Sequence, residues 1–435
     1  MNKYLVLVLS LLGCLVFTQA KAQAVPADSL SLDQAIDNVL QNQPSLDQIK
    51  AEVDAAQAQV QEAHAGYYPQ VDANADYSHI DPVPSFTFAN GGSVDIAPYN
   101  NYNFNVSIAQ QIYDFGRTKS NIELAQSKML TTKDRSQVVK WTLSYYTAHI
   151  FNSILFLEHS MEVEDEQIST LKHDLDLVKK RQESGAATNY DLLTTKVQIA
   201  TEQNRKTDLE NEREQQIINL RKLMGWDQSR PVSIKGDLVL KDSTLENVLP
   251  PVDLKNRPDY QLLQDKKDFF QQQYQLARTI EKPSLNAMAS AGFKDGYPKD
   301  LNRLYGNWVL GVNLKVPLFS GYRSRYQQQA AKANLRSVTA QENDLQRNIQ
   351  SQVASASSDF ESAKKKLNTA NLQIEQAREQ IKLARLRYEN GVITSQDLLD
   401  SETKLAQARL QRLNYIYKMI MSRYDLDKAL GKQIW

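Results

Sequence analysis

The chain of 435 residues carries 51 Lys and Arg residues against 51 Asp and Glu residues, so its formal net charge is zero. This balance gives neither the basic excess typical of nucleic-acid binding nor the acidic excess typical of a disordered tail. The mean hydropathy is −0.52 although 41% of the residues are hydrophobic, which favours helices that bury only a narrow apolar stripe.

The N-terminus has the pattern of a signal peptide, predicted to cover residues 1–22. Lys3 precedes an apolar run over residues 4–17, and the Ala-Lys-Ala at 20–22 has the form of a cleavage site. We therefore expect export from the cytoplasm. The single cysteine, Cys14, lies inside the apolar run, so the mature chain would have no thiol chemistry. An alternative is lipidation of Cys14, because the residues around it loosely resemble a lipobox.

Four segments alternate apolar and polar residues with a period of two, which predicts β-strands: 69–80, 99–113, 285–293 and 308–318. Each has about ten residues or more, enough for a tilted strand to cross a bilayer. Their polar faces are mostly uncharged Asn and Ser, which suits the inside of a membrane barrel. Two amphipathic hairpins that cover a soluble core would show the same alternation. We expect the loops within each strand pair to be extracellular.

Very long helices are predicted wherever the chain lacks glycine and proline, because these residues interrupt helices. The intervals without either residue are 118–184, 186–224, 322–390 and 392–430. A helix of about 67 residues would be about 100 Å long, far longer than a compact domain needs. Apolar residues from Leu367 to Tyr388 follow a heptad spacing, and we expect the charged residues outside this seam to face water. An ordinary antiparallel coiled coil would show the same seam.

An internal duplication organises the chain. Residues 181–193 and 387–399 are identical at seven of thirteen positions, at an offset of 206. Gly116 also matches Gly321, at an offset of 205. We therefore predict a first repeat over 23–225, a proline-containing linker over 226–256 that packs around the helices, a second repeat over 257–431 and a tail over 432–435. The fold class is mainly α, with four strands per chain.

Four strands alone leave two open edges, which a lipid bilayer does not tolerate. Other chains must therefore complete the barrel. Two chains would give eight strands, whose interior is filled by side chains, whereas three would give twelve strands around water. The sequence thus favours three or more chains around a water-filled β-barrel.

The strongest repeated motif lies where a long helix ends and the next begins. A glycine follows each long helix, at the position that favours a left-handed backbone. Three residues later a Thr begins a T-x-x-D pattern, which is a capping box with Asp in place of Glu. A capping role is the simplest interpretation of the two aspartates, and a ring of carboxylates at a constriction is the functional one. The residues are Gly185, Thr188 and Asp191 in the first tip, and Gly391, Thr394 and Asp397 in the second.

The chain resembles the TolC family of outer-membrane efflux proteins. The resemblance rests on the duplicated plan, on Tyr-Tyr-Pro at 67–69, on Lys-Val-Pro-Leu-Phe-Ser-Gly at 315–321, and above all on the two G-x-x-T-x-x-D-L-L tips. It implies a passive homotrimeric export duct, with a 12-stranded β-barrel in the outer membrane and a long coiled-coil α-barrel that extends into the periplasm. It also implies partners: outer-membrane lipid, a periplasmic adaptor protein that docks on the tips, and an inner-membrane pump. The implied system is tripartite efflux or type I secretion.

The resemblance also implies roles for individual tip residues. Those of the pore or gate are Asp191, Tyr388, Asp397 and Asp400, and those of the adaptor-docking tips are Gly185, Thr188, Gly391 and Thr394. In the founding member, an arginine two residues after the second tip glycine helps to latch the gate, but this chain has Ile393 there. We therefore expect another contact to hold the closed state. Thr194 stands at the repeat position of Asp400, so that carboxylate is not duplicated.

Two other classes of function compete with this one. An enzyme is disfavoured because the chain has no catalytic or nucleotide-binding motif, and its histidines lack the spacing of metal ligands. These are His64, His79, His149, His159 and His173. We accordingly expect no cofactor and no nucleic-acid partner. A soluble periplasmic coiled-coil adaptor or structural protein would share the long helices, but would not need four amphipathic strands.

Overall fold

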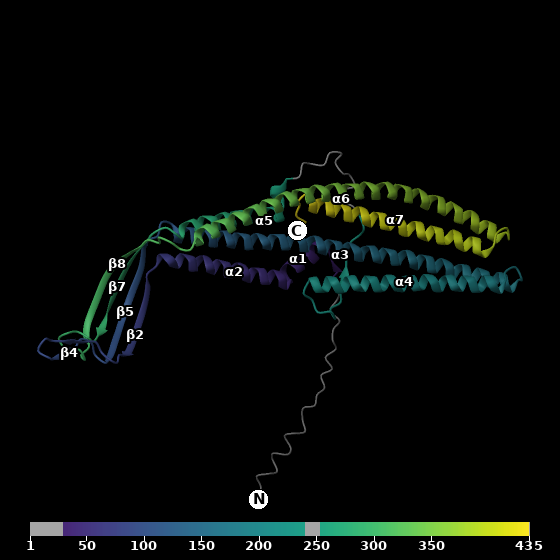
Figure 1. Cartoon of the computed structure of the whole chain (residues 1–435). Coiled ribbons are helices and arrows are strands. Elements are labelled where there is room, and N and C mark those ends of the chain that lie inside the picture. The colour runs from purple at the N-terminus through teal and green to yellow at the C-terminus, as the bar shows by residue number, and fades with distance from the viewer. Residues whose placement is uncertain (1–28, 240–252, 435) are drawn as a thin grey trace, which may run out of the picture.

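The computed structural model describes residues 29–239 and 253–434. The chain is strongly elongated, with a sheet at one end and two helix tips at the other (Figure 1). The predicted signal peptide, its cleavage site and Cys14 lie outside the described residues. None of the helices in the described part is long and apolar enough to cross a membrane.

The two halves of the chain have matching elements. The first half contains β1 (Ser29–Leu30), α1 (Leu32–Asn42), α2 (Pro44–His64), β2 (Gln70–His79), β3 (Ser85–Thr87), β4 (Ser93–Asp95), β5 (Asn100–Tyr113), α3 (Arg117–Glu183) and α4 (Asn189–Leu223). After β6 (Ser233–Ile234), the second half contains α5 (Pro258–Thr279), β7 (Ser284–Lys294), β8 (Tyr305–Lys315), α6 (Arg323–Glu389) and α7 (Ser395–Ala429). Both α3 and α6 have 67 residues, and both α4 and α7 have 35, so the internal duplication extends to helix length.

The four long strands form one antiparallel sheet in the order β2-β5-β7-β8. The register brings the apolar residues of neighbouring strands together on one face, as in the row Ala75, Phe104, Phe293. On β8 this face carries Trp308 and Leu310, which are 78% and 73% exposed. Among the described residues, β2 and β8 each have a partner along one edge only, so the sheet is open on both sides.

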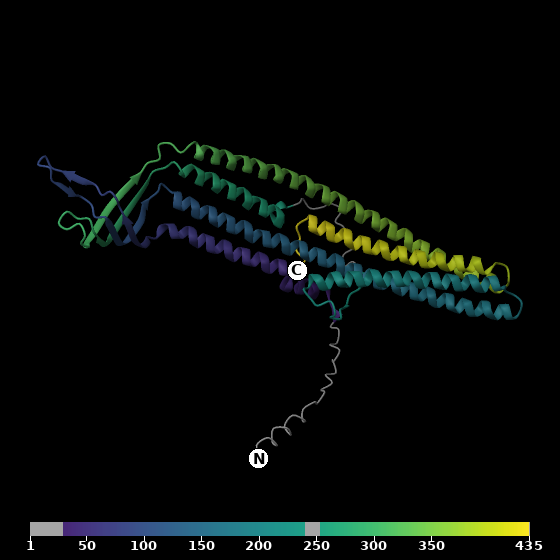
Figure 2. The same cartoon turned by 60° about the horizontal axis from the view of Figure 1, so that its bottom comes forward.

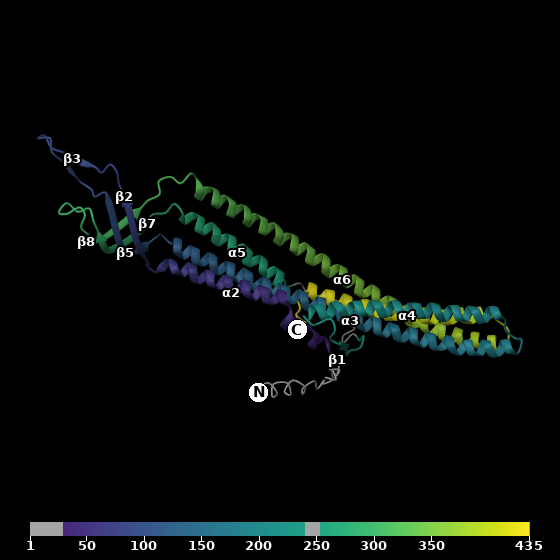
Figure 3. The same ribbon diagram turned by 90° about the horizontal axis from the view of Figure 1, so that it is seen from below.

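The two longest helices, α3 and α6, lie beside different shorter helices near the strands and near the tips. Figures 2 and 3 show α2 and α5 beside the strand-proximal halves of α3 and α6, and α4 and α7 beside the halves that lead to the tips. On α6, the predicted heptad seam is largely buried: Ala370, Ile374, Ala377, Ala384 and Tyr388. The helices therefore pack along this narrow stripe, as the low mean hydropathy indicates.

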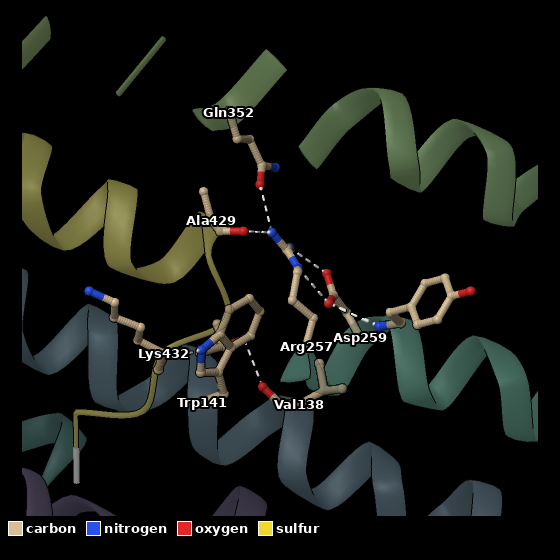
Figure 4. Close-up of polar contacts among 9 residues, drawn as sticks. Val138, Trp141, Arg257, Asp259, Gln352, Ala429 and Lys432 are labelled. Carbon is tan, nitrogen blue, oxygen red and sulfur yellow. Dashed lines mark hydrogen bonds and ion pairs between the residues drawn. The ribbon is translucent and has the colours of Figure 1, made fainter. Parts of the chain in front are cut away.

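A joint between the two repeats lies where the strand-proximal and tip-proximal helices meet. Arg257, 3% exposed, precedes α5 and donates hydrogen bonds to the Asp259 carboxylate at 2.7 and 3.0 Å and to the Ala429 carbonyl at 2.8 Å (Figure 4). Its guanidinium lies 5.1 Å from the ring centroid of Trp141 on α3. One buried arginine thus connects α3, α5 and the end of α7.

The first part of the linker packs against the helices. Strand β6 pairs in parallel with β1, and Ile234 and Leu238 pack beside Phe151 and Leu155 of α3. The prolines at 250 and 251 lie outside the described residues.

The structure corrects one detail of the duplication. Helices α3 and α6 begin at Arg117 and Arg323, an offset of 206 rather than 205. Gly116 therefore corresponds to Tyr322, and Phe115 to Gly321. All four residues have a positive φ, from 55° to 88°. Two consecutive residues before each long helix thus have a left-handed backbone. The glycine is the second of the two in the first repeat and the first of the two in the second repeat, which accounts for the one-residue error in the offset.

Candidate gate at the helix tips

Each tip begins with the same backbone turn, which ends a 67-residue helix. Gly185 and Gly391 have φ values of 74° and 71°, the left-handed conformation that glycine adopts without strain. The amide of Ala186 donates to the Arg181 carbonyl at 2.7 Å, and that of Val392 donates to the Arg387 carbonyl at 2.9 Å. These bonds are typical of a Schellman motif, which satisfies the last carbonyls of the helix.

Each tip ends with the predicted capping box. The Asp191 amide donates to the Thr188 hydroxyl at 3.2 Å, and the Thr188 amide donates to the Asp191 carboxylate at 2.8 Å. Thr394 and Asp397 repeat this arrangement at the start of α7, with distances of 3.2 and 3.0 Å. The hydrogen bonds from Thr394 lower the pKa of Asp397. The structural role that the sequence indicated for both aspartates is thus present.

Asp191 has a second contact for which Asp397 shows no counterpart among the described residues. The Ser395 hydroxyl donates a hydrogen bond to the other oxygen of Asp191, which joins the first turn of α4 to the first turn of α7. This bond is the main reason that the pKa of Asp191 is lowered, followed by the bonds from Thr188. Asp397 and Asp400 are exposed instead, and Asp400 accepts a hydrogen bond from Gln396 at 2.8 Å.

Tyr388 lies at the centre of the contact between the two tips. It is 4% exposed, and burial raises the pKa of its hydroxyl. Arg181, at the end of α3, stacks on its ring at 4.6 Å from the centroid and donates to the Tyr388 carbonyl at 2.7 Å. Ile393 is partly buried in the same apolar cluster, with Leu398. At the position where the resemblance implies a gate arginine, this chain therefore has an apolar contact.

The structure brings together part of the predicted site. Asp191 and Tyr388 lie at the contact between the tips, whereas Asp397 and Asp400 lie on the exposed flank of the second tip. Sequence reasoning missed Arg181 and Ser395. Arg181 stands at the repeat position of Arg387, and only packing distinguishes them, because Arg387 is exposed.

The structure also contradicts one expectation about the long helices. The carboxyl groups of these helices were expected to face water, but four of them are at most 2% exposed: Glu164, Asp174, Glu202 and Glu402. Arginines explain part of this burial, since Arg205 contacts Glu202 at 2.9 Å and Arg385 contacts Glu402 at 2.8 Å. A carboxylate can be buried where an arginine pairs with it, from the same helix for Glu202 and from an adjacent helix for Glu402.

Comparisons with known proteins agree with this architecture. The model of the outer membrane efflux protein family matches residues 35–226 and 249–432. The pyoverdine export outer membrane protein OpmQ of Pseudomonas putida is 25% identical, over 95% of this chain and 90% of that protein. Outer membrane protein TolC of Escherichia coli is 21% identical, over 92% of this chain and 83% of that protein. The crystal structure of the outer membrane protein VceC from Vibrio cholerae has a TM-score of 0.77 at 20% identity, over 93% of this chain and 97% of that one, and has the same fold.

The family match covers both repeats and most of the chain. Since the relatives are outer-membrane proteins and the solved structure shares the elongated plan of strands and long helices, the chain belongs to the outer membrane efflux protein family and is an export channel of the outer membrane.

Proposed function

We propose that three copies of this chain form one export duct, closed or opened at its helix tips. The observation that carries this proposal is the four-stranded sheet, set at one end of helices about 100 Å long, whose edges at β2 and β8 are unpaired within the described part of the chain. Strand edges in lipid must be paired, and pairing β8 of one copy with β2 of the next satisfies them. Three copies give twelve strands, wide enough to hold water.

The two faces of the sheet suit this assembly. The apolar face, with Trp308, would face lipid. The opposite face carries polar side chains that bond to one another, as where Asn74 donates to Asn105 and Ser107 at 3.2 and 3.1 Å. A polar face of this kind would line an aqueous channel.

The tips are proposed as the periplasmic gate. In a trimer, Asp397 and Asp400 would each occur three times around one axis, and such rings attract cations and repel anions. Asp191 and Tyr388 would act differently, by holding the two tips of each copy together. Closure would then depend on Arg181 and Tyr388 rather than on the arginine that Ile393 replaces.

The outer surface of the tips is proposed as the docking site for a periplasmic adaptor protein. The same turn occurs twice per chain, at Gly185 with Thr188 and at Gly391 with Thr394, so a trimer would present six similar turns. An inner-membrane pump would supply the energy and select the cargo, in either efflux or type I secretion. A soluble coiled-coil adaptor is the alternative function, and the exposed apolar face of the sheet argues against it.

Single-channel recording tests the gate directly. The purified protein in planar bilayers should form a cation-selective pore that divalent cations block, and Asp400→Ala should weaken both properties. Gln396→Ala provides the control, because it removes the partner of Asp400 but keeps the charge. An unchanged selectivity and divalent block in Asp400→Ala would contradict the proposed carboxylate ring.

A further inference from the structure

Three helices meet at a buried charged cluster about one to three helical turns from the tips. Asp174 of α3 and Glu402 of α7 are 2% and 1% exposed, and Arg385 of α6 contacts both. The guanidinium donates to Glu402 at 2.8 Å and lies 3.7 Å from Asp174. This cluster, called the α3–α7 cluster below, joins the first repeat to the second.

Some carboxyl oxygens of the α3–α7 cluster have no hydrogen-bond donor within the described part of the chain. Both carboxyl oxygens of Asp174 and one of Glu402 are buried without a hydrogen-bond partner among the described residues. Yet both carboxyl groups lie beside the same Arg385 guanidinium, at 2.8 Å for Glu402 and 3.7 Å for Asp174. Two carboxylates that share one arginine repel each other, whereas one proton between them turns the contact into a hydrogen bond and leaves a single negative charge for Arg385.

The surrounding charges do not supply the missing donor. A cleft of about 570 Å³ beside the cluster is lined by Asp165 and Glu166 of α3 and by Arg409 of α7. Arg409 is paired with Glu166 at 2.6 Å, and Asp165 is paired with Lys206 of α4 at 2.6 Å. On α6, Glu389 adds a further negative charge near Arg385. The cleft gives water, and hence protons, a path to Glu402.

We propose that a proton shared by Asp174 and Glu402 locks α7 onto α3, and that the tip end of the molecule loosens when this proton leaves. The lock itself is a property of the folded chain. Its role in opening a duct rests on the proposed function.

The titration of Glu402 sets the direction of the effect. Burial raises its pKa to about 8, with the hydrogen bond and the charge of Asp174 as further causes, and Arg385 opposes the shift. A raised native pKa means that the stabilisation is complete below the ordinary glutamate pKa and is lost as the pH rises through about 8. The contact between α3 and α7 should therefore weaken in alkaline conditions and not in acidic ones.

A second cluster on α3 repeats the arrangement. Glu164 of α3 and Arg205 of α4 line one cleft, and the carboxylate of Glu202 accepts hydrogen bonds from Arg205 at 2.9 Å and Gln198 at 2.6 Å. One oxygen of Glu164 is buried without a partner among the described residues. Burial raises the pKa of Glu164 to about 7, and the charge of Glu202 adds to this effect. Two carboxyl groups with one arginine is thus a recurring contact of α3.

Hydrogen exchange at the tip half of α7 tests the lock. The full-length protein in detergent is compared with Glu402→Gln, whose amide imitates the protonated acid, at pH 6 and pH 9. Exposed Glu379→Gln on α6 is the matched control. We expect equal exchange in residues 395–409 for all three proteins at pH 6. At pH 9 we expect at least tenfold faster exchange in the parent protein and in the control than in Glu402→Gln.

Equal exchange of the parent and Glu402→Gln at pH 9 would overturn the lock. Asp174→Asn provides a second variant in case Glu402→Gln fails to fold, and it should also remove the alkaline increase. Conductance in planar bilayers tests the proposed duct independently of the lock. An alkaline rise in conductance that Glu402→Gln abolishes supports both the lock and the duct. A folded protein that forms no pore at any pH contradicts the duct, and the exchange result then decides whether the lock exists.

Discussion

The hydroxyl of Ser395 donates a hydrogen bond to the carboxylate of Asp191, and this bond ties the start of α7 to the start of α4 within one chain. The duplication does not repeat it, because the residue equivalent to Ser395 in the first repeat is Asn189, and the equivalent of Asp191 is the exposed Asp397. The two aspartates therefore cap their helices alike, but only Asp191 also joins the two tips.

Asp191→Ala should loosen the tips more than Asp397→Ala, because both variants lose a capping box but only the first loses the bond to Ser395. That bond contributes about 1 kcal/mol. Limited proteolysis at the tip loops measures the difference, and the first variant should be cleaved faster. Since the native pKa of Asp191 is lowered, the stabilisation should be present at neutral pH and lost as the pH falls below the usual aspartate range. Equal cleavage of the two variants would show that the bond to Ser395 has no effect.

Arg181→Gln should weaken the contact between α3 and α6 by about 1–3 kcal/mol, because charged donors to two carbonyls and a cation–π contact with Tyr388 are lost. Arg387→Gln is the control, since Arg387 occupies the same repeat position but is exposed. Single-channel recording should show more frequent opening for Arg181→Gln alone. If both variants open alike, Arg181 does not take the role that the resemblance implies for an arginine at the position of Ile393.

Gly292→Ala should disrupt the sheet, because a Cβ atom there would lie 2.0 Å from the Phe104 carbonyl oxygen of the neighbouring strand. Gly306→Ala in β8 is the control, because its Cβ would meet its first neighbour only at 3.8 Å. Overpacking of this kind costs about 1–3 kcal/mol. The amount of heat-resistant oligomer on unheated gels should fall for Gly292→Ala and stay normal for Gly306→Ala. A normal amount of oligomer in both variants would mean that β5 and β7 can move apart without destabilising the oligomer.

Leu310→Arg should hinder membrane insertion, because a cationic side chain on the lipid face of a strand costs about 2–4 kcal/mol near the bilayer midplane. Asn313→Arg, on the opposite face of the same strand, is the matched control. Outer-membrane fractions should contain much less of the first variant than of the second. Equal amounts would contradict the assignment of the apolar face to lipid.

The sequence contains enough information to predict the long elements. Glycine and proline mark the ends of α3, α4, α6 and α7 to within a few residues, and the period of two identifies the strands, because both signals depend only on the local backbone. The short hairpin of β3 and β4 in the loop at 81–98 was not predicted, since three-residue strands are too short to show a period.

The contacts at the site depend on tertiary structure and could be predicted only in part. The capping boxes of Asp191 and Asp397 follow from local spacing, so the sequence predicts them. The bond from Ser395 to Asp191 joins residues 204 positions apart. The burial of Asp174 and Glu402 likewise arises only when α3, α6 and α7 come together, and a charged residue in sequence otherwise indicates a solvated face.

The proposed duct depends most on the number of chains that complete the sheet. The mass of the mature protein, extracted from outer membranes in detergent and measured by light scattering or native mass spectrometry, tests this number directly. We expect three copies in one particle that forms pores in planar bilayers. A single copy that stays in solution without detergent would contradict it.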